Sequence, residues 1–228
     1  MILMIFDNPL QAANKFSEKL LQYKELEGHI IIGNSIKNIP FIETIASELN
    51  LYYDMLFNKG IYAPNNECQI AKISETRDIV CIQELIEAFS ITQEYILSMS
   101  TVLYDESIMG KIAKYRKSLP LSNLKGKDIL LLDQGSNSGL TINVCHKSLL
   151  GLGVRSIKYA SALVAADAYN YYNDLFDKVY YLEKIEHFID KDYYYKQPLE
   201  ISSEYACEIL ETSNYYLPYQ KEINEKNN

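Results

Sequence analysis

A loop of small polar residues follows a continuous apolar run in the middle of the chain. The run Ile129–Leu132 ends at Asp133, and Gly135 and Gly139 then enclose the segment Ser136–Ser138. Glycine permits tight turns with positive φ, and the hydroxyl and amide groups between the glycines can donate hydrogen bonds. A helical pattern begins directly after the loop, where free N–H groups and the helix dipole favour an anion such as a phosphate. The loop therefore predicts an anion-binding site.

The loop matches neither of the two common phosphate motifs. It has no lysine at the P-loop position, and its glycines do not follow the G-x-G-x-x-G pattern. A structural alternative explains the loop alone equally well. In this alternative the segment is a Gly/Ser-rich connection from strand to helix, and Thr141 caps the helix.

Strands and helices alternate along the chain. The run His29–Gly33 is continuous, apolar and β-branched, which is typical of a strand buried on both faces. Alternation of this kind predicts the α/β class, with a mostly parallel sheet flanked by helices on both faces and a small additional β/helical region. We expect helices at residues 9–26, 39–49, 93–117, from about 140, and 202–210. We expect strands at residues 29–33, 50–60, 68–74, 78–82, 128–132, 156–164 and 178–183.

Two loops take the position at which α/β sheets bind ligands, past the carboxyl ends of the strands. One is the segment 34–38, after the first predicted strand, and the other is the segment 133–141. Ligand chemistry is therefore expected where these two loops meet.

Composition limits the classes of function. The chain has 228 residues and a formal net charge of -8, which disfavours a nucleic-acid polymer as partner. The apolar opening Met1–Phe6 is too short for a signal or a membrane span, so we expect a cytoplasmic protein with no membrane partner. The four cysteines and three histidines share no metal-ligand spacing, so no direct metal site is expected.

The wider pattern around the loop resembles the phosphoribosyltransferase family. In that family a hydrophobic strand ends in two acidic residues and a T-G-x-T loop, and the corresponding stretch here is LKGKDILLLDQGSNSGLTI. A second family stretch contains VPVA.EIA..L, then a Lys, a Pro and P-E-x-A-I-G, and Lys59, Pro64, Glu67 and Ile70 fall on those positions. The segment KYRKSLPLSNLKGK resembles the family's YR…L.GK, and EISSEYACEIL is similar to the tail of uncharacterised members. The resemblance covers about residues 5–212.

The resemblance implies roles for particular residues. It places the 5-phosphate and ribose of phosphoribosyl pyrophosphate on Asp133, Gln134, Gly135, Ser136, Asn137, Ser138, Gly139, Leu140 and Thr141. It places the pyrophosphate loop on Asn34, Ser35, Ile36, Lys37 and Asn38. Asp133 and Lys37 are the implied catalytic residues. Lys59 is an implied ligand contact, with an ordinary surface lysine as the alternative, and Arg116 is expected to pack or pair at the surface.

Several positions depart from the family pattern. The second acid of the family is Gln134 here, and the first threonine of its phosphate loop is Ser138. An arginine followed by two glycines becomes Ile36, Lys37 and Asn38. The change to Ile36 removes a bidentate clamp for phosphate, which a lysine replaces only as a point charge. The phosphate loop is therefore expected to function, whereas the pyrophosphate loop is altered.

Two functions follow from the resemblance. The first is a phosphoribosyltransferase that binds phosphoribosyl pyrophosphate or a nucleotide 5-phosphate. It transfers a phosphoribosyl group to an acceptor that the sequence does not identify, or removes the group from it, and its Mg²⁺ arrives with the pyrophosphate substrate. The second is a non-catalytic protein of the same fold that binds a nucleotide or sugar phosphate as a sensor or assembly partner. We expect one domain at residues 1–218, with a core at 5–165, an extension at 175–218 and a disordered tail at 219–228. The resemblance also implies a homodimer, because members of the family often form one.

Overall fold

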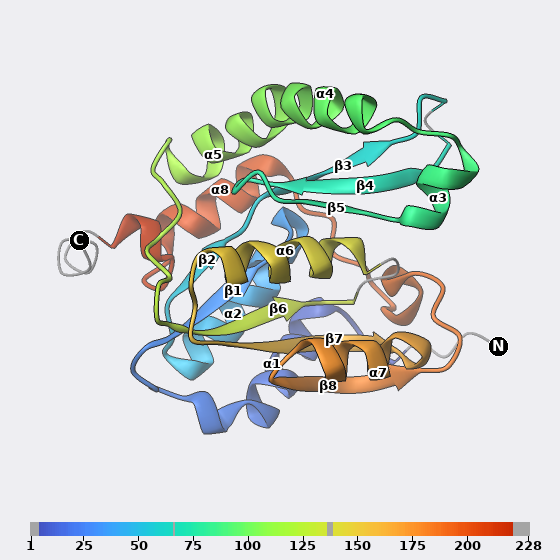
Figure 1. Cartoon of the computed structure of the whole chain (residues 1–228). Coiled ribbons are helices and arrows are strands. Elements are labelled where there is room, and N and C mark those ends of the chain that lie inside the picture. Colours follow the sequence, from blue (N-terminus) through green and yellow to red (C-terminus); the bar gives the residue numbers. More distant parts are fainter. Residues whose placement is uncertain (1–4, 66, 136–138, 221–228) are drawn as a thin grey trace.

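A five-stranded parallel sheet forms the centre of the molecule. The computed structural model describes residues 5–65, 67–135 and 139–220. The strand order is β2-β1-β6-β7-β8, and every neighbouring pair is parallel (Figure 1). The strands are β1 (His29–Gly33), β2 (Tyr53–Met55), β6 (Asp128–Asp133), β7 (Ser156–Ala165) and β8 (Lys178–Ile185). All six residues of β6 are buried, as a central strand covered on both faces requires.

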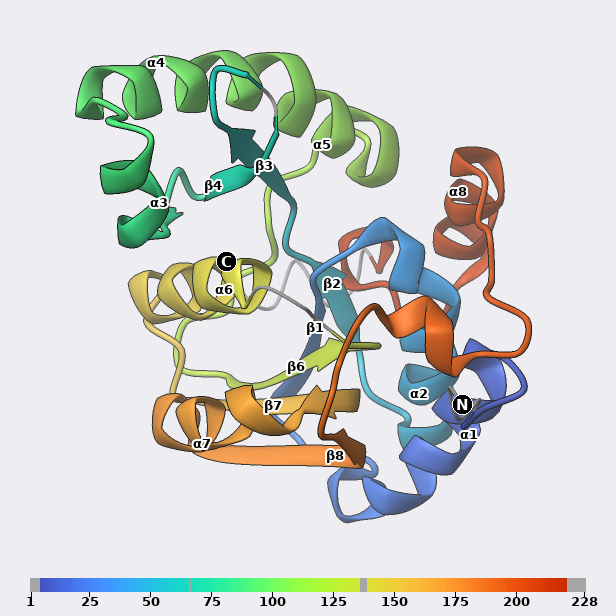
Figure 2. The same ribbon diagram turned by 90° about the vertical axis from the view of Figure 1, so that its right-hand side faces the viewer.

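Helices cover both faces of this sheet, which confirms the predicted α/β architecture. Helices α1 (Pro9–Lys19) and α2 (Ile39–Leu49) pack on one face, and α6 (Leu140–Gly151) and α7 (Ala166–Leu175) on the other (Figure 2). Alternate residues of each strand pack into the cores on the two faces of the sheet, because successive side chains point to opposite faces. Ile31 and Leu130 belong to the core beneath α1 and α2, whereas Ile30 and Ile129 belong to the core beneath α6.

A smaller unit, made of an antiparallel sheet and the helices that follow it, comes directly after β2 in the chain. It contains β3 (Asn58–Tyr62), β4 (Gln69–Ser74) and β5 (Ile79–Cys81), followed by α3 (Gln83–Ala88), α4 (Gln93–Leu103), a π-helical segment (Tyr104–Ile108) and α5 (Met109–Arg116). Helix α4 lies across the small sheet (Figure 1). The predicted additional region is therefore present, and the helical region predicted at 93–117 is confirmed.

The strand predicted at residues 50–60 is wrong. The chain instead forms β2 in the parallel sheet and β3 in the small sheet, with a break at Leu56 and Phe57. Leu56 and Phe57, at the break, are apolar and buried, so neither marks the point at which the chain leaves one sheet for the other. The short helix α3 and the helix α7 were not predicted.

Arg116 lies at the junction of the two units and is fully buried, which corrects its expected surface position. Its Nη1 donates to Glu75 Oε2 at 2.6 Å, and its Nη2 lies 3.3 Å from Asp54 Oδ1. Nη2 also donates to the carbonyl of Met55. Because Asp54 belongs to β2 and Glu75 follows β4, this cluster joins the small unit to the main sheet.

The C-terminal part of the chain packs back on the core. Strand β8 pairs with β7, and short bridges join Phe6 to Tyr195 and Tyr53 to Tyr216. Helix α8 (Ser203–Thr212) packs against α2 and α5. The remaining 3-10 turns are η1 (Leu21–Tyr23), η2 (Ile36–Asn38), η4 (Lys191–Tyr194) and η5 (Leu217–Tyr219). Most of the predicted tail, 221–228, lies outside the described residues, and no described helix is long and apolar enough to span a membrane.

Candidate functional site

The two predicted loops meet at the carboxyl edge of the parallel sheet. Strands β1 and β6 are neighbours, with Gly33 opposite Leu132. The chain leaves β1 toward β2 through α2, whereas it leaves β6 in the opposite direction toward β7 through α6. A crevice forms at such a topological switch point, and α/β sheets bind their ligands there. The fold thus brings segments 34–38 and 133–141 together.

Asn38 links the two loops. Its Nδ2 lies 3.1 Å from Asn34 Oδ1 and 3.1 Å from Asp133 Oδ1. All three side chains are buried, and the carbonyl of Asn34 accepts a bond of 2.9 Å from Asn58 Nδ2. Asn38 Oδ1 is buried and has no donor among the described residues. A buried acceptor without a donor costs stability, so a ligand hydroxyl or a water at this point would satisfy it.

Asp133 is held by donors on both of its oxygens. Besides Asn38, the backbone N–H of Gln134 donates to Oδ1 at 2.8 Å, and the hydroxyl of Tyr159 donates to Oδ2 at 3.3 Å. Burial and then the charge of Asp133 raise the pKa of Tyr159, so this hydroxyl keeps its proton. The carboxylate is therefore fixed in orientation at the end of β6.

The two glycines of the phosphate loop have conformations that other residues rarely adopt. Gly135 has φ +143°, and a Cβ there would lie 3.2 Å from Leu163 Cβ and 3.3 Å from Phe188 Cζ. Gly139 has φ +68° and is the N-cap of α6. Leu140 is buried, so its side chain faces the core. Ser136, Asn137 and Ser138 lie outside the described residues, and their predicted phosphate contacts stay predictions.

Thr141 accepts a hydrogen bond from a lysine of the small sheet. Lys72 Nζ lies 2.6 Å from Thr141 Oγ1, and the backbone of Lys72 belongs to β4. Burial has the largest effect and lowers the pKa of Lys72; Cys145 and Asp133 act in the opposite direction, and the positive charge of Lys59 lowers the pKa further. The sequence analysis did not identify Lys72, because a single polar position in a strand is the ordinary pattern of a half-buried sheet.

Lys111 of α5 is the second cation that the sequence analysis missed. Its Nζ donates to the carbonyl of Asn58 at 2.7 Å. Burial, followed by the charges of Lys59 and Lys72, lowers its pKa from 10.5 to about 8. Among the described residues, no carboxylate forms an ion pair with Lys37, Lys59, Lys72 or Lys111. These cations would be stabilised by an anion in the space between the small unit and the strand ends.

Gln134 also has a cationic neighbour. The side chain is buried, and Lys191 Nζ lies 3.3 Å from its Oε1. Lys191 comes from the 3-10 turn η4, in an acidic stretch of sequence that resembles an ordinary solvated surface. Its place at the site follows from the way the C-terminal extension folds back, and no local pattern indicates it.

Two adjoining cavities open at the strand ends. The first, of about 150 Å³, is lined by Asn34, Ser35, Asn38, Asp133, Gly135, Thr141 and Lys191. The second, of about 340 Å³, shares Asn34 and Ser35 with the first and extends to Lys37 and Lys111. Lys37 and Lys59 are both exposed, and Ile36 is half-buried beside the second cavity. The first cavity thus joins Asp133, Gly135 and Thr141 of the predicted ribose and phosphate residues, and the second contains the predicted pyrophosphate lysine, Lys37.

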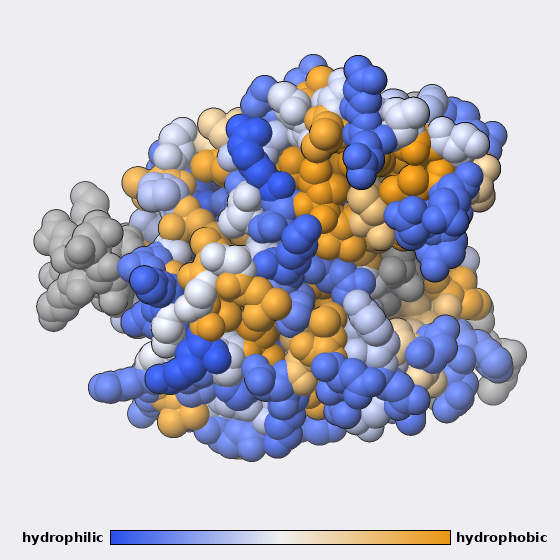
Figure 3. Space-filling model, in the orientation of Figure 1, coloured by the Kyte–Doolittle hydropathy of each residue, from blue (hydrophilic) through white to orange (hydrophobic). Residues whose placement is uncertain are grey.

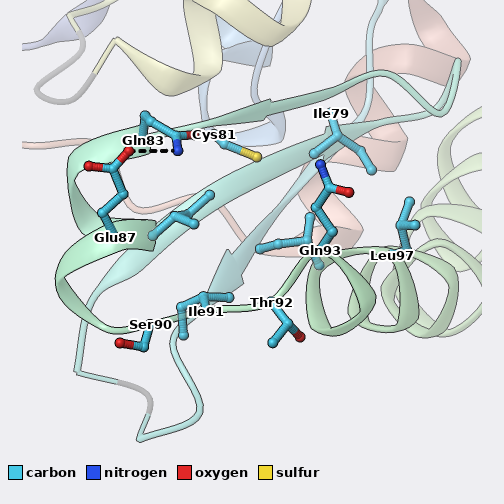
Figure 4. A pocket seen from close by; sticks show the side chains of 11 residues that line it. Ile79, Cys81, Gln83, Glu87, Ser90, Ile91, Thr92, Gln93 and Leu97 are labelled. Atoms are coloured by element: carbon cyan, nitrogen blue, oxygen red, sulfur yellow. Dashed lines mark hydrogen bonds between the residues drawn. The ribbon is translucent and has the colours of Figure 1, made fainter.

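A larger recess, of about 730 Å³, lies within the small unit. Its walls come from β5, α3 and α4 and are mostly apolar, with Gln93 directed into it (Figure 4). The apolar surface beside α4 is visible as an orange area in Figure 3. The recess contains no lysine or arginine, so its chemistry differs from that of the cavities at the strand ends.

The described residues contain no group of three or more His, Cys, Asp or Glu side chains that could hold a metal ion. Asn38 turns its Nδ2, not its Oδ1, toward Asp133, and both Asp133 oxygens accept hydrogen bonds from the protein. A Mg²⁺ ion that keeps several waters and arrives with substrate phosphates needs no direct ligand from these residues.

Comparison with known proteins finds relatives by structure. No family model matches the chain, and no curated protein matches its sequence. The crystal structure of TT1426 from Thermus thermophilus is similar over 90% of this chain and 97% of that chain, with a TM-score of 0.74 and 20% identity. The chain therefore shares its fold with that protein. Identity at this level shows the fold alone.

Structures of named phosphoribosyltransferases match less closely. A purine phosphoribosyltransferase from Pyrococcus horikoshii has a TM-score of 0.43 at 14% identity, over 80% of this chain and 88% of that chain. A hypoxanthine phosphoribosyltransferase from Staphylococcus aureus has a TM-score of 0.43 at 11% identity, over 81% of this chain and 77% of that chain.

Proposed function

We propose that the protein is a phosphoribosyltransferase that binds phosphoribosyl pyrophosphate at the ends of β1 and β6. The observation that carries the proposal is the convergence of Asp133, Gly135 and Thr141 on one cleft at the topological switch point, with Lys72 bonded to Thr141. The ligand is a small phosphorylated sugar or nucleotide, because the cleft is small and Lys72 and Lys111, near it, form no ion pair with a carboxylate among the described residues.

The roles of the residues follow from their positions. The 5-phosphate lies on the loop between Gly135 and Thr141, with Lys72 beside it. Asp133 accepts hydrogen bonds from the ribose hydroxyls, and Asn38 Oδ1 accepts another. Lys37 lies at the mouth of the adjoining cavity, on the pyrophosphate side. Catalysis then comes from positioning and from stabilising charge, since no side chain needs to form a covalent bond to the sugar.

The reaction is a substitution at C1 of the ribose. The lone pair of the acceptor forms a bond to C1, while the bond from C1 to the pyrophosphate oxygen breaks and its electron pair leaves with the pyrophosphate. A proton carried by the attacking atom passes to water. A Mg²⁺ ion that accompanies the pyrophosphate would neutralise charge on the leaving group, and the chain would contact this ion through the substrate and through water rather than as a direct ligand.

A second function, binding without turnover, is favoured by one observation. Gln134 replaces an acid of the family pattern, and its amide oxygen is already bonded to Lys191. In this version the protein binds a nucleotide or sugar phosphate as a sensor or assembly partner, through the same cleft.

Calorimetry distinguishes the two functions. Phosphoribosyl pyrophosphate and adenosine monophosphate are titrated into the full chain with and without Mg²⁺, and pyrophosphate release is followed with a panel of acceptors. Mg²⁺-dependent binding with pyrophosphate release supports the transferase. Tight monophosphate binding without turnover supports the sensor, and no binding of either ligand overturns both.

A further inference from the structure

The recess of about 730 Å³ in the small unit is separate from the phosphate cleft, because no described residue lines both it and a cavity at the strand ends. Ile79 of β5, Ile86 of α3 and Ile96 of α4 contribute to its lining. Ile91 lies in the loop between the two helices (Figure 4). Sites for small molecules typically have volumes of about 300–1,000 Å³ and mostly apolar walls, so the recess has the size and lining of a ligand site.

The apolar surface of the recess is aliphatic and partly open to solvent. Leu97 lines the recess and is nevertheless 61% exposed. The described residues of the lining include four isoleucines and no aromatic side chain. An aliphatic chain therefore suits these walls better than a planar ring, which has no ring to stack on here. Such a chain would be stabilised by the removal of its apolar surface from water.

The stretch of chain that forms the recess is acidic. From Asp78 to Gly110 the sequence has no Lys, Arg or His and six acids, which are Asp78, Glu84, Glu87, Glu94, Asp105 and Glu106. Glu87 lines the recess, and its Oε1 accepts a hydrogen bond of 3.0 Å from Gln83 Nε2. Within the described part of the chain, Glu84, Glu87 and Glu94 form no ion pair. The negative charge at the recess favours a cation and opposes an anion.

Other occupants fit the recess less well. The carbonyl of Ile79, on the edge strand β5, already accepts a hydrogen bond of 3.0 Å from Lys147 Nζ, so an added strand would lose part of its ladder. Helix α3 has six residues and is about 9 Å long, which is too short a wall for the helix of a partner. Two copies joined symmetrically at this face would place the acids of one copy against those of the other. A small molecule therefore fits best.

We propose that the recess binds a small aliphatic amine, whose chain lies on the isoleucines of the walls and whose ammonium group lies beside Glu87. Gln83 stays on Oε1 of Glu87, and Oε2 accepts a hydrogen bond from the ammonium group. The lysines near the phosphate cleft, Lys72 and Lys111, repel the same ligand, so charge directs an amine to the recess and a phosphate to the cleft. The site does not depend on the transferase function.

The test compares hexylamine with three other small molecules. Hexanol has the same chain without the charge, hexanoate has the opposite charge, and methylamine has the charge without the chain. Each is titrated into the nitrogen-labelled full chain, and two-dimensional NMR of the backbone amides measures the affinity and shows where the molecule binds.

Two variants, each with a control, separate the contributions of charge and chain. Glu87→Gln removes the charge beside the recess, and Glu18→Gln, at an exposed position of α1, is its control. Leu97→Gln removes part of the apolar wall, and Val102→Gln, at an exposed position of α4 outside the recess, is its control. Thermal unfolding checks that every variant is folded.

Hexylamine is expected to shift amide signals of β5, α3 and α4 and to bind at least about tenfold more tightly than hexanoate or methylamine. Glu87→Gln should weaken hexylamine about threefold and leave hexanol unchanged. Leu97→Gln should weaken both, and the two controls should weaken neither. Hexanoate or methylamine binding as tightly as hexylamine overturns the proposal, as do shifts confined to other elements or no binding at all. Dimerisation that Leu97→Gln abolishes, measured by analytical ultracentrifugation, would assign the recess to a second copy and also overturn it.

Discussion

Lys72 Nζ lies 2.6 Å from Thr141 Oγ1, so a side chain of the small sheet reaches the first turn of α6 across the ligand cleft. The positive end of a helix dipole repels a cation, and burial already lowers the pKa of this lysine. An ammonium group in this place is unfavourable for the unliganded protein and favourable for binding a phosphate.

Lys72→Met is therefore expected to change binding and stability in opposite directions. Loss of a charged hydrogen bond of about 1.5–3 kcal/mol weakens ribose 5-phosphate binding by roughly 10–100-fold. The melting temperature of the unliganded protein should stay the same or rise, because a buried charge is removed. Calorimetry and thermal unfolding measure the two effects, with Lys125→Met as the exposed control. A variant that binds ribose 5-phosphate as tightly as the original chain would rule out a phosphate contact by Lys72.

Lys111 makes stability depend on pH in a predictable direction. Burial, with the charges of Lys59 on β3 and Lys72 on β4, lowers its pKa to about 8 from 10.5. Between these values the unfolded chain binds the proton that the folded chain has lost, so this lysine makes the free energy of unfolding rise with pH. Urea unfolding from about pH 8 to pH 9.5 should show a less positive slope for Lys111→Gln than for the original chain. Identical slopes would mean that Lys111 keeps an ordinary pKa.

The elements that carry the cleft could be predicted, because their signals are local. Strands β1 and β6 are continuous apolar runs, and both are followed directly by small polar residues. The glycine pattern likewise predicted the tight loop, and Gly135 and Gly139 both have positive φ. Because β1 and β6 were expected in one parallel sheet, the loops that follow them were expected to meet at its carboxyl edge.

The cations of the site could not be predicted, because their places depend on contacts distant in sequence. Lys72 is 69 residues from Thr141, and Lys191 is 57 residues from Gln134. Each reaches the cleft only after the small sheet and the C-terminal extension have packed. The break between β2 and β3 was missed for a related reason, since Leu56 and Phe57 are buried and carry no turn signal.

Gln134→Glu is expected to increase transferase activity. The substitution restores the acidic pair of the family pattern, and Lys191, which lies 3.3 Å from the present Oε1 and 2.8 Å from Asp192, can bond the new carboxylate as well. We expect Mg²⁺-dependent release of pyrophosphate to rise at least about tenfold, which corresponds to about 1.4 kcal/mol of barrier. Gln134→Met is the matched control, because it removes the bond to Lys191 and introduces no charge. A folded Gln134→Glu variant without increased turnover would favour the non-catalytic function.

Arg116→Met should destabilise the protein far more than loss of an exposed arginine. The substitution leaves Asp54 and Glu75 buried without their counter-charge, and breaking a buried ion pair costs about 3–5 kcal/mol. Arg155→Met is the control, because the Arg155 side chain is 63% exposed, and its buried partner Asp128 keeps a bond from Ser156 and has Lys158 4.0 Å away as a remaining counter-charge. Urea unfolding gives both values. Equal losses in the two variants would show that the buried cluster contributes no more than a surface pair, and the joint between the small unit and the main sheet would then depend on apolar packing alone.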